Sequence, residues 1–250
     1  MSLAAALAPS ASPFPSRASW EVISRSGQGR PIRALRVGNP RARTKVMVVG
    51  AIHGNEPAGK AVVARLRRSH PPRGTALWLV SDANPDGAAA GDRHNAAGVD
   101  LNRNFPYRWR PQDGVYESGP SPASEPETQV MQRFIERERP RVTVWYHQAL
   151  TMVVKSAGDA ALERRYASRG DLPRGRLPAY TGTATSWQNH LLSGGSAFVV
   201  ELPGGPLSPE GVRGHSAAVL SLAKAIAPPR SARAQRSRRP ARSTGARAAP

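Results

Sequence analysis

The segment KVMVVGAIHGNEPAGKAVVARLRRSHPPRGTALWLV, residues 45–80, contains two apolar runs on either side of an amphipathic stretch. Residues 45–50 and 76–80 are almost continuously apolar, a pattern typical of strands that are buried on both faces of a sheet. Between them, residues 58–68 carry valine and leucine at helical spacing. A strand, a helix and a second strand in this order predict a βαβ unit, and therefore an α/β domain.

The strand pattern continues on both sides of this unit. Residues 142–146 and 197–200 are two more short apolar runs, which we predict to be buried strands. Residues 20–26 and 32–38 are rich in β-forming side chains and flank a turn that contains glycine and proline. These two runs predict a hairpin at the start of the domain.

Two helices and a long loop complete the predicted domain. The sequence SEPE at residues 124–127 resembles a helix start, with Ser124 as the cap and a proline in the first turn. Residues 209–225 predict a closing helix. Residues 84–124 are rich in glycine, proline and asparagine and show little periodicity, which in a compact domain indicates a functional loop.

The composition is typical of a single domain without disulfide bonds. The chain has 250 residues, of which 39% are hydrophobic, so it can form one sizeable core but is short for two enzymatic domains. We therefore expect one domain, over residues 19–227. Because the chain has no cysteine, any metal must be held by histidine and carboxylate side chains.

Both ends of the chain differ from the predicted domain. Residues 228–250 contain seven arginines, no acidic residue and no apolar periodicity, which predicts a disordered basic tail. Such a tail either is solvated without a partner or makes a weak contact with a polyanion. Residues 1–18 predict a disordered leader or the remnant of a signal. No complete signal peptide is visible in them, so the sequence leaves a cytoplasmic and an extracytoplasmic location open. No apolar run reaches the roughly 18 residues of a membrane span.

A histidine and a glutamate directly follow the first predicted strand, in the sequence HGNE at residues 53–56. Open α/β sheets carry their ligand sites at the carboxyl ends of the strands. His53 and Glu56 can converge on one cation there, since zinc accepts both imidazole nitrogen and carboxylate oxygen. A turn in which the pair has only a capping role is the other interpretation.

His147 and Glu201 lie at the ends of two further predicted strands. His147 as a third ligand would complete a set with an open fourth position, which is typical of catalytic zinc; the alternative is a core histidine bonded to a backbone carbonyl. Glu201 would be either a carboxylate that faces water or a base beside the metal. Suitable polar groups at three strand ends favour the catalytic interpretation. We interpret the other histidines as surface or structural residues: His70, His94, His190 and His215.

The predicted long loop carries two arginines, Arg93 and Arg103, the second within the sequence GVDLNRNFP at residues 98–106. Arginine binds carboxylates through two parallel hydrogen bonds, and the adjacent Asn102 adds a directional donor and acceptor. A solvated charge is the alternative for Arg93. The shared loop, which starts at the carboxyl end of a strand, favours a role at the predicted metal.

Taken together, these motifs resemble the M14 zinc carboxypeptidases in their order and approximate spacing, over about residues 46–205. Within that family the chain looks most like the bacterial murein peptide amidases, which cut the γ-D-glutamyl to meso-diaminopimelate bond of cell-wall peptides. The residues that carry the resemblance are HGNE at 53–56, NPDG at 84–87, GVDLNRNFP at 98–106, SEPETQ at 124–129, His147 and Glu201.

The resemblance implies a mixed sheet of about eight strands flanked by helices, with one zinc ion per chain at its carboxyl edge. His53, Glu56 and His147 would hold the metal, and Glu201 would be the general base that takes a proton from water. By the same resemblance, Arg93 would polarise the scissile carbonyl, Asn102 and Arg103 would bind the terminal carboxylate of the substrate, and Tyr180 would be the family's mobile tyrosine near that end.

The implied reaction is hydrolysis of a peptide or isopeptide bond next to a free carboxylate. Thr185 and Ser186 are neutral where carboxypeptidases specific for lysine or arginine have an acid, which suits diaminopimelate but also other small side chains. We expect a monomer that acts on a peptide or muropeptide. One alternative is an aspartoacylase-like or succinylglutamate desuccinylase-like amidohydrolase for N-acyl amino acids, which shares the HGNE signature. Another is an inactive peptidase fold that binds anionic polymers.

Overall fold

The computed structural model describes residues 18–229 of the protein. The strands are β1 (Ser19–Arg25), β2 (Pro31–Gly38), β3 (Thr44–Val49), β4 (Thr75–Val80), β5 (Val142–Gln148), β6 (Met152–Val154), β7 (Arg174–Gly175) and β8 (Ser196–Leu202). The α-helices are α1 (Ala58–Leu66), α2 (Pro85–Ala90), α3 (Pro126–Glu138), α4 (Ala160–Gly170), α5 (Ala184–Leu191) and α6 (Pro209–Ala225). Two short 3₁₀ helices are η1 (Leu101–Arg103) and η2 (Gly114–Tyr116).

The strands form one mixed sheet of eight, in the order β1-β2-β4-β3-β5-β8-β6-β7. The central strands β4, β3, β5 and β8 are parallel, whereas β1, β2 and β6 pair antiparallel with their neighbours towards the centre. The predicted βαβ unit is confirmed as β3, α1 and β4, and the predicted hairpin as β1 and β2. Because the four central strands are parallel, their carboxyl ends meet at one edge of the sheet.

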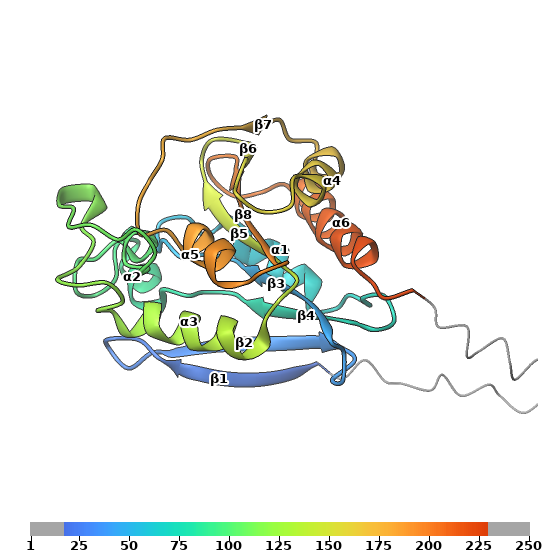
Figure 1. The fold of residues 1–250 in the computed structure, drawn as a ribbon, viewed down its shortest axis with the longest axis horizontal. Coiled ribbons are helices and arrows are strands. Elements are labelled where there is room, and N and C mark those ends of the chain that lie inside the picture. Colours follow the sequence, from blue (N-terminus) through green and yellow to red (C-terminus); the bar gives the residue numbers. More distant parts are fainter. Residues whose placement is uncertain (1–17, 230–250) are drawn as a thin grey trace, which may run out of the picture.

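Helices cover both faces of the sheet, which explains the continuous apolar runs (Figure 1). Val46 and Val48 belong to the core under α1, α4 and α6. Met47 and Val49 point to the opposite face and belong to the core under α3 and α5. Successive residues of a strand alternate between faces, so a strand that is covered on both sides needs apolar residues at every position.

Two predictions about local structure are wrong. Glu125, not Ser124, is the cap residue of α3, because the Ser124 hydroxyl donates to the Glu125 carboxylate (2.7 Å) and accepts from Asn104 Nδ2 (2.9 Å). The predicted loop 84–124 contains the helix α2, whose sequence PDGAAA has no apolar stripe; the Asn84 side chain caps it by accepting from Gly87 N.

The predicted leader, residues 1–18, and tail, residues 228–250, lie outside the described residues except for their innermost positions. The described residues between them form a single sheet with its two helical layers. Within this part of the chain, no helix is both long and apolar enough to cross a membrane.

Candidate active site

The turn after β3 and the ends of β5 and β8 bring the predicted polar residues to the carboxyl edge of the sheet. His53 and Glu56 lie in the turn between β3 and α1, whereas His147 and Glu201 are the second-last residues of β5 and β8. His147 and Glu201 are paired in the register of these neighbouring parallel strands. The turn packs closely: a Cβ atom at Gly54 would collide with the backbone of Gly87 and Ala88 in α2. Glycine is therefore required for His53 and Glu56 to reach their positions.

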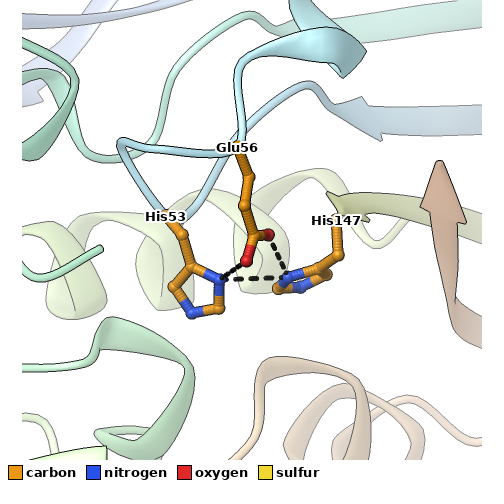
Figure 2. A group of neighbouring side chains, drawn as sticks. All are labelled: His53, Glu56 and His147. Atoms are coloured by element: carbon orange, nitrogen blue, oxygen red, sulfur yellow. Dashed lines mark hydrogen bonds and ion pairs between the residues drawn. The ribbon is translucent and has the colours of Figure 1, made fainter. Parts of the chain in front are cut away.

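Three side chains point toward one another at this edge (Figure 2). One possible ligand atom from each of His53, Glu56 and His147 lies within 4.8 Å of the others. His53 Nδ1 is 2.9 Å from Glu56 Oε1, and His147 Nδ1 is 2.8 Å from Glu56 Oε2. The side chains are buried, and imidazole nitrogen with carboxylate oxygen is a donor set that zinc accepts. The cluster can therefore hold one metal ion.

The electrostatics of the cluster favour an anionic Glu56. Burial by itself would raise the pKa of Glu56, but hydrogen bonds with His147 and His53 hold it well below its usual range. Burial would likewise lower the pKa of His53, but its hydrogen bonds with Asp100 and Glu56 raise the pKa above its ordinary value.

Asp100, a residue with no role predicted from the sequence, contacts the side of His53 that faces away from Glu56. Its Oδ1 lies 2.9 Å from His53 Nε2, so the carboxylate directs His53 Nδ1 toward Glu56 and His147. Asp100 is fully buried, and these bonds hold its pKa below the usual range against the effect of burial. Histidines that bind metal almost always donate their other ring N–H in this way. Asp100 lies within the quoted segment GVDLNR, but its contact with His53 depends on the path of the loop.

Arg93 lies against the same cluster. Its Nε and Nη2 donate to Asp100 Oδ2 at 3.0 and 2.8 Å. Its Nη1 lies 3.2 Å from both Glu56 Oε1 and His53 Nδ1. The guanidinium is therefore fixed by two carboxylates while its side chain keeps 21% of its surface exposed.

Glu201 is buried with an unsatisfied oxygen. Glu201 is 7% exposed, and its Oε2 has no hydrogen-bond partner among the residues that the structure describes. Burial raises the pKa of Glu201, and the charge of Glu56 adds to this effect, although His147 opposes it. A carboxylate with a raised pKa beside three candidate metal ligands is suited to accept and return a proton.

Arg103 lies farther along the same loop, next to two tyrosines. It is 3% exposed, and its Cζ lies 4.2 Å from the centre of the Tyr180 ring and 4.6 Å from that of Tyr116. Asn102 is held by its Oδ1, which accepts from Ala184 N at the start of α5 (3.0 Å). Tyr180 thus packs on Arg103, the neighbour of Asn102 in the chain. Tyr116 is a second aromatic neighbour of Arg103, with no role predicted from the sequence.

Comparisons with known proteins agree with this site. The family model described as zinc carboxypeptidase matches residues 3–186. Murein peptide amidase A of Escherichia coli (strain K12) is 34% identical over 126 residues, which cover 45% of this chain and 52% of that protein. The chain thus spans about half the length of the curated murein peptide amidases that it matches.

Solved structures give the same result for the fold. The crystal structure of the murein-tripeptide amidase MpaA from Escherichia coli O157 aligns with a TM-score of 0.67 and 26% identity, over 85% of this chain and 94% of that chain. Carboxypeptidase A from Helicoverpa armigera aligns with a TM-score of 0.69 and 21% identity, over 86% and 69% of the two chains. The second likeness concerns the fold alone.

Proposed function

The chain belongs to the zinc carboxypeptidase family, and from this membership we propose that it is a zinc-dependent hydrolase of peptide or isopeptide bonds next to a free carboxylate. We further propose that its substrate is the γ-D-glutamyl-diaminopimelate bond of cell-wall peptides. The observation that carries the proposal is the convergence of His53, Glu56 and His147 within 4.8 Å at the carboxyl edge of the sheet.

The residues at this edge fit a single zinc ion. His53, Glu56 and His147 would hold it, and Asp100 would keep His53 in the required orientation through its 2.9 Å contact with Nε2. Bound zinc supplies Lewis acidity, which polarises a carbonyl group and makes water a better nucleophile at neutral pH.

Glu201 is proposed as the general base. Its raised pKa and its unpartnered Oε2 support a role in which it takes a proton from the attacking water. The same carboxyl group would then give that proton to the leaving amine, so that it is regenerated in each cycle. Its register position opposite His147 keeps it next to the metal ligands.

Arg93 is proposed to stabilise the negative charge that develops on the carbonyl oxygen. Asp100 holds its guanidinium through two hydrogen bonds, which leaves little freedom to reorganise during the reaction. Donors that are fixed before the reaction are the most effective stabilisers of an oxyanion.

Arg103, Asn102 and Tyr180 are proposed to bind the terminal carboxylate of the substrate. Arg103 is a buried cation, and a carboxylate that reached it would make charge-assisted hydrogen bonds in a site with little water. This would place the scissile bond on the amino side of the residue that carries the carboxylate. Similarity to murein peptide amidases supports diaminopimelate as that residue.

The proposal is tested with the full chain, loaded with zinc and incubated with L-alanyl-γ-D-glutamyl-meso-diaminopimelate. We expect mass spectrometry to detect free diaminopimelate and metal analysis to find one zinc per chain. An N-acyl amino acid serves as the competing substrate. Hydrolysis of the N-acyl amino acid alone would assign the chain to the amidohydrolases, and zinc-loaded protein that cleaves neither compound would contradict the proposal.

A further inference from the structure

The Arg103 guanidinium is buried without a carboxylate in contact. Among residues 18–229 no Asp or Glu lies within ion-pair distance of it, since the carboxylates of the site, Glu56 and Asp100, pair with His53, His147 and Arg93. The only hydrogen bond of the guanidinium in this part of the chain runs from Nη1 to the Asn102 carbonyl (2.8 Å). Its buried Nε has no hydrogen-bond partner there. Burial lowers the pKa of Arg103, although an arginine remains charged. A buried cation is costly unless something compensates it. The nearby charge of Asp100 opposes the lowering of the Arg103 pKa, and the aromatic neighbours add a further attraction.

Two tyrosine rings form a corner around this guanidinium. Cζ of Arg103 lies 4.6 Å from the Tyr116 ring centre and 4.2 Å from the Tyr180 ring centre. The two ring centres are only 5.6 Å apart, so both rings stand on adjoining sides and do not sandwich the cation. The π faces attract the charge, so the two rings partly compensate the buried guanidinium.

Tyr116 also lies under the second arginine of the site. Cζ of Arg93 is 5.9 Å from the Tyr116 ring centre, within the range of a cation–π contact. The two arginines repel each other, and this repulsion contributes to the lowered pKa of Arg103. Arg93 is held by Asp100 and Glu56, so the ring attracts Arg103 toward a cation that is already fixed.

The backbone around Tyr116 is fixed to the loop that carries both arginines. Asp100 N donates to the Glu117 carbonyl (2.7 Å), and His94 Nε2 lies 3.2 Å from the Val115 carbonyl. These bonds hold the residues on either side of Tyr116. The Tyr116 ring is therefore held in place where it contacts both guanidinium groups.

We propose that Tyr116 is a positioning residue that sets the separation between Arg93 and Arg103, and thereby the selectivity for substrates with a free carboxylate. The inference rests on the proposed function, in which Arg93 acts at the scissile carbonyl and Arg103 at the terminal carboxylate. Tyr116 contacts neither group of the substrate in this role; it acts through the two arginines.

Three variants of the zinc-loaded full chain test this role. Tyr116→Phe keeps the π face, whereas Tyr116→Leu keeps much of the bulk without it. Tyr107→Leu is the matched control, because the Tyr107 ring contacts His190 and Arg108, outside the site. For a peptide with a free terminal carboxylate, we expect Tyr116→Leu to raise KM about tenfold with kcat changed much less, the size of one lost cation–π contact.

The carboxamide form of the same peptide shows whether the effect is specific. We expect Tyr116→Leu to leave the KM of the carboxamide nearly unchanged, and Tyr116→Phe to behave like the unmodified chain with both peptides. If Tyr116→Leu raised the KM of the carboxylate and the carboxamide equally, or if Tyr107→Leu raised KM by the same factor, the loop would be disturbed in general and the inference would be overturned.

A binding measurement separates this inference from the proposed function. N-acetylalanine and N-acetylalaninamide are titrated into each zinc-loaded variant and followed by NMR, which requires no turnover. If the unmodified chain hydrolyses no peptide but binds the carboxylate, and Tyr116→Leu weakens this binding about tenfold, the proposed function fails and the inference holds. If the unmodified chain is active but Tyr116→Leu binds the carboxylate equally well, the inference fails alone.

Discussion

The Nδ1 atoms of His53 and His147 lie 3.2 Å apart, although 94 positions separate the two residues in the chain. Their rings meet edge to face, with centroids 4.7 Å apart. Because β3 and β5 are neighbouring parallel strands, residues at their carboxyl ends are brought together by the sheet itself. This proximity is what a shared metal ion requires.

Replacement of Asp100 with asparagine is expected to weaken metal binding. The amide cannot hold His53 Nε2–H as the carboxylate does, and loss of such a partner lowers metal affinity by about 10- to 100-fold. Competition with a chromophoric zinc chelator measures the change. Asp159→Asn is the matched control, since Asp159 caps α4; equal affinities of the Asp100 variant and the unmodified chain would contradict the assignment.

Replacement of Glu201 with glutamine is expected to abolish most of the turnover while metal remains bound. Glutamine has nearly the same shape but cannot accept the proton, and loss of a general base costs about 10²-fold or more. Steady-state kinetics and metal analysis on the same preparation measure both effects. A variant with nearly normal turnover would rule out Glu201 as the base.

Gly54→Ala is expected to destabilise the protein and disturb the metal cluster. The added methyl group would meet the backbone of Gly87 and Ala88, and overpacking of this kind costs about 1–3 kcal/mol. Gly214→Ala is the control: its Cβ would meet nothing within 4 Å in α6, so the free energy of unfolding should rise by about 0.5–1 kcal/mol. Urea unfolding measures the free energy of unfolding, which should fall in Gly54→Ala and rise in Gly214→Ala.

Stability is expected to fall between pH 6.5 and 4 partly because of His215. Burial lowers the pKa of His215 from 6.5 to about 4, and its Nδ1 lies 2.9 Å from the Tyr166 hydroxyl. In this pH range His215 binds a proton in the unfolded chain but not in the folded chain. The contribution of neutral His215 to the free energy of unfolding is therefore complete above about pH 6.5 and is lost as the pH falls toward 4.

The variant His215→Gln should therefore lose less stability over this range, by up to about 3 kcal/mol. Urea unfolding at pH 7, 5.5 and 4.5 measures the difference. The exposed His70 provides the control substitution His70→Gln. Identical pH dependence in the unmodified chain and His215→Gln would show that His215 does not contribute.

The sequence by itself predicted the central part of the fold. Apolar runs with helical segments between them predicted β3, α1, β4, β5, β8 and α6, because strands covered on both faces must be apolar throughout. It did not predict β7, which has two residues, or β6, which has three, since such short elements carry no periodic pattern. Pairing with the rest of the sheet defines them.

The site, too, could be predicted only in part from the sequence. His53, Glu56, His147 and Glu201 could be identified from the sequence because each directly follows or ends a buried strand, and parallel strands bring such positions to one edge. Their chemical roles remain predictions. Asp100 and Tyr116 could not be assigned, because their contacts with His53, Arg93 and Arg103 depend on the path of an irregular loop. The hydrogen bonds that fix that loop join residues distant in sequence, and only the tertiary structure determines which of them form.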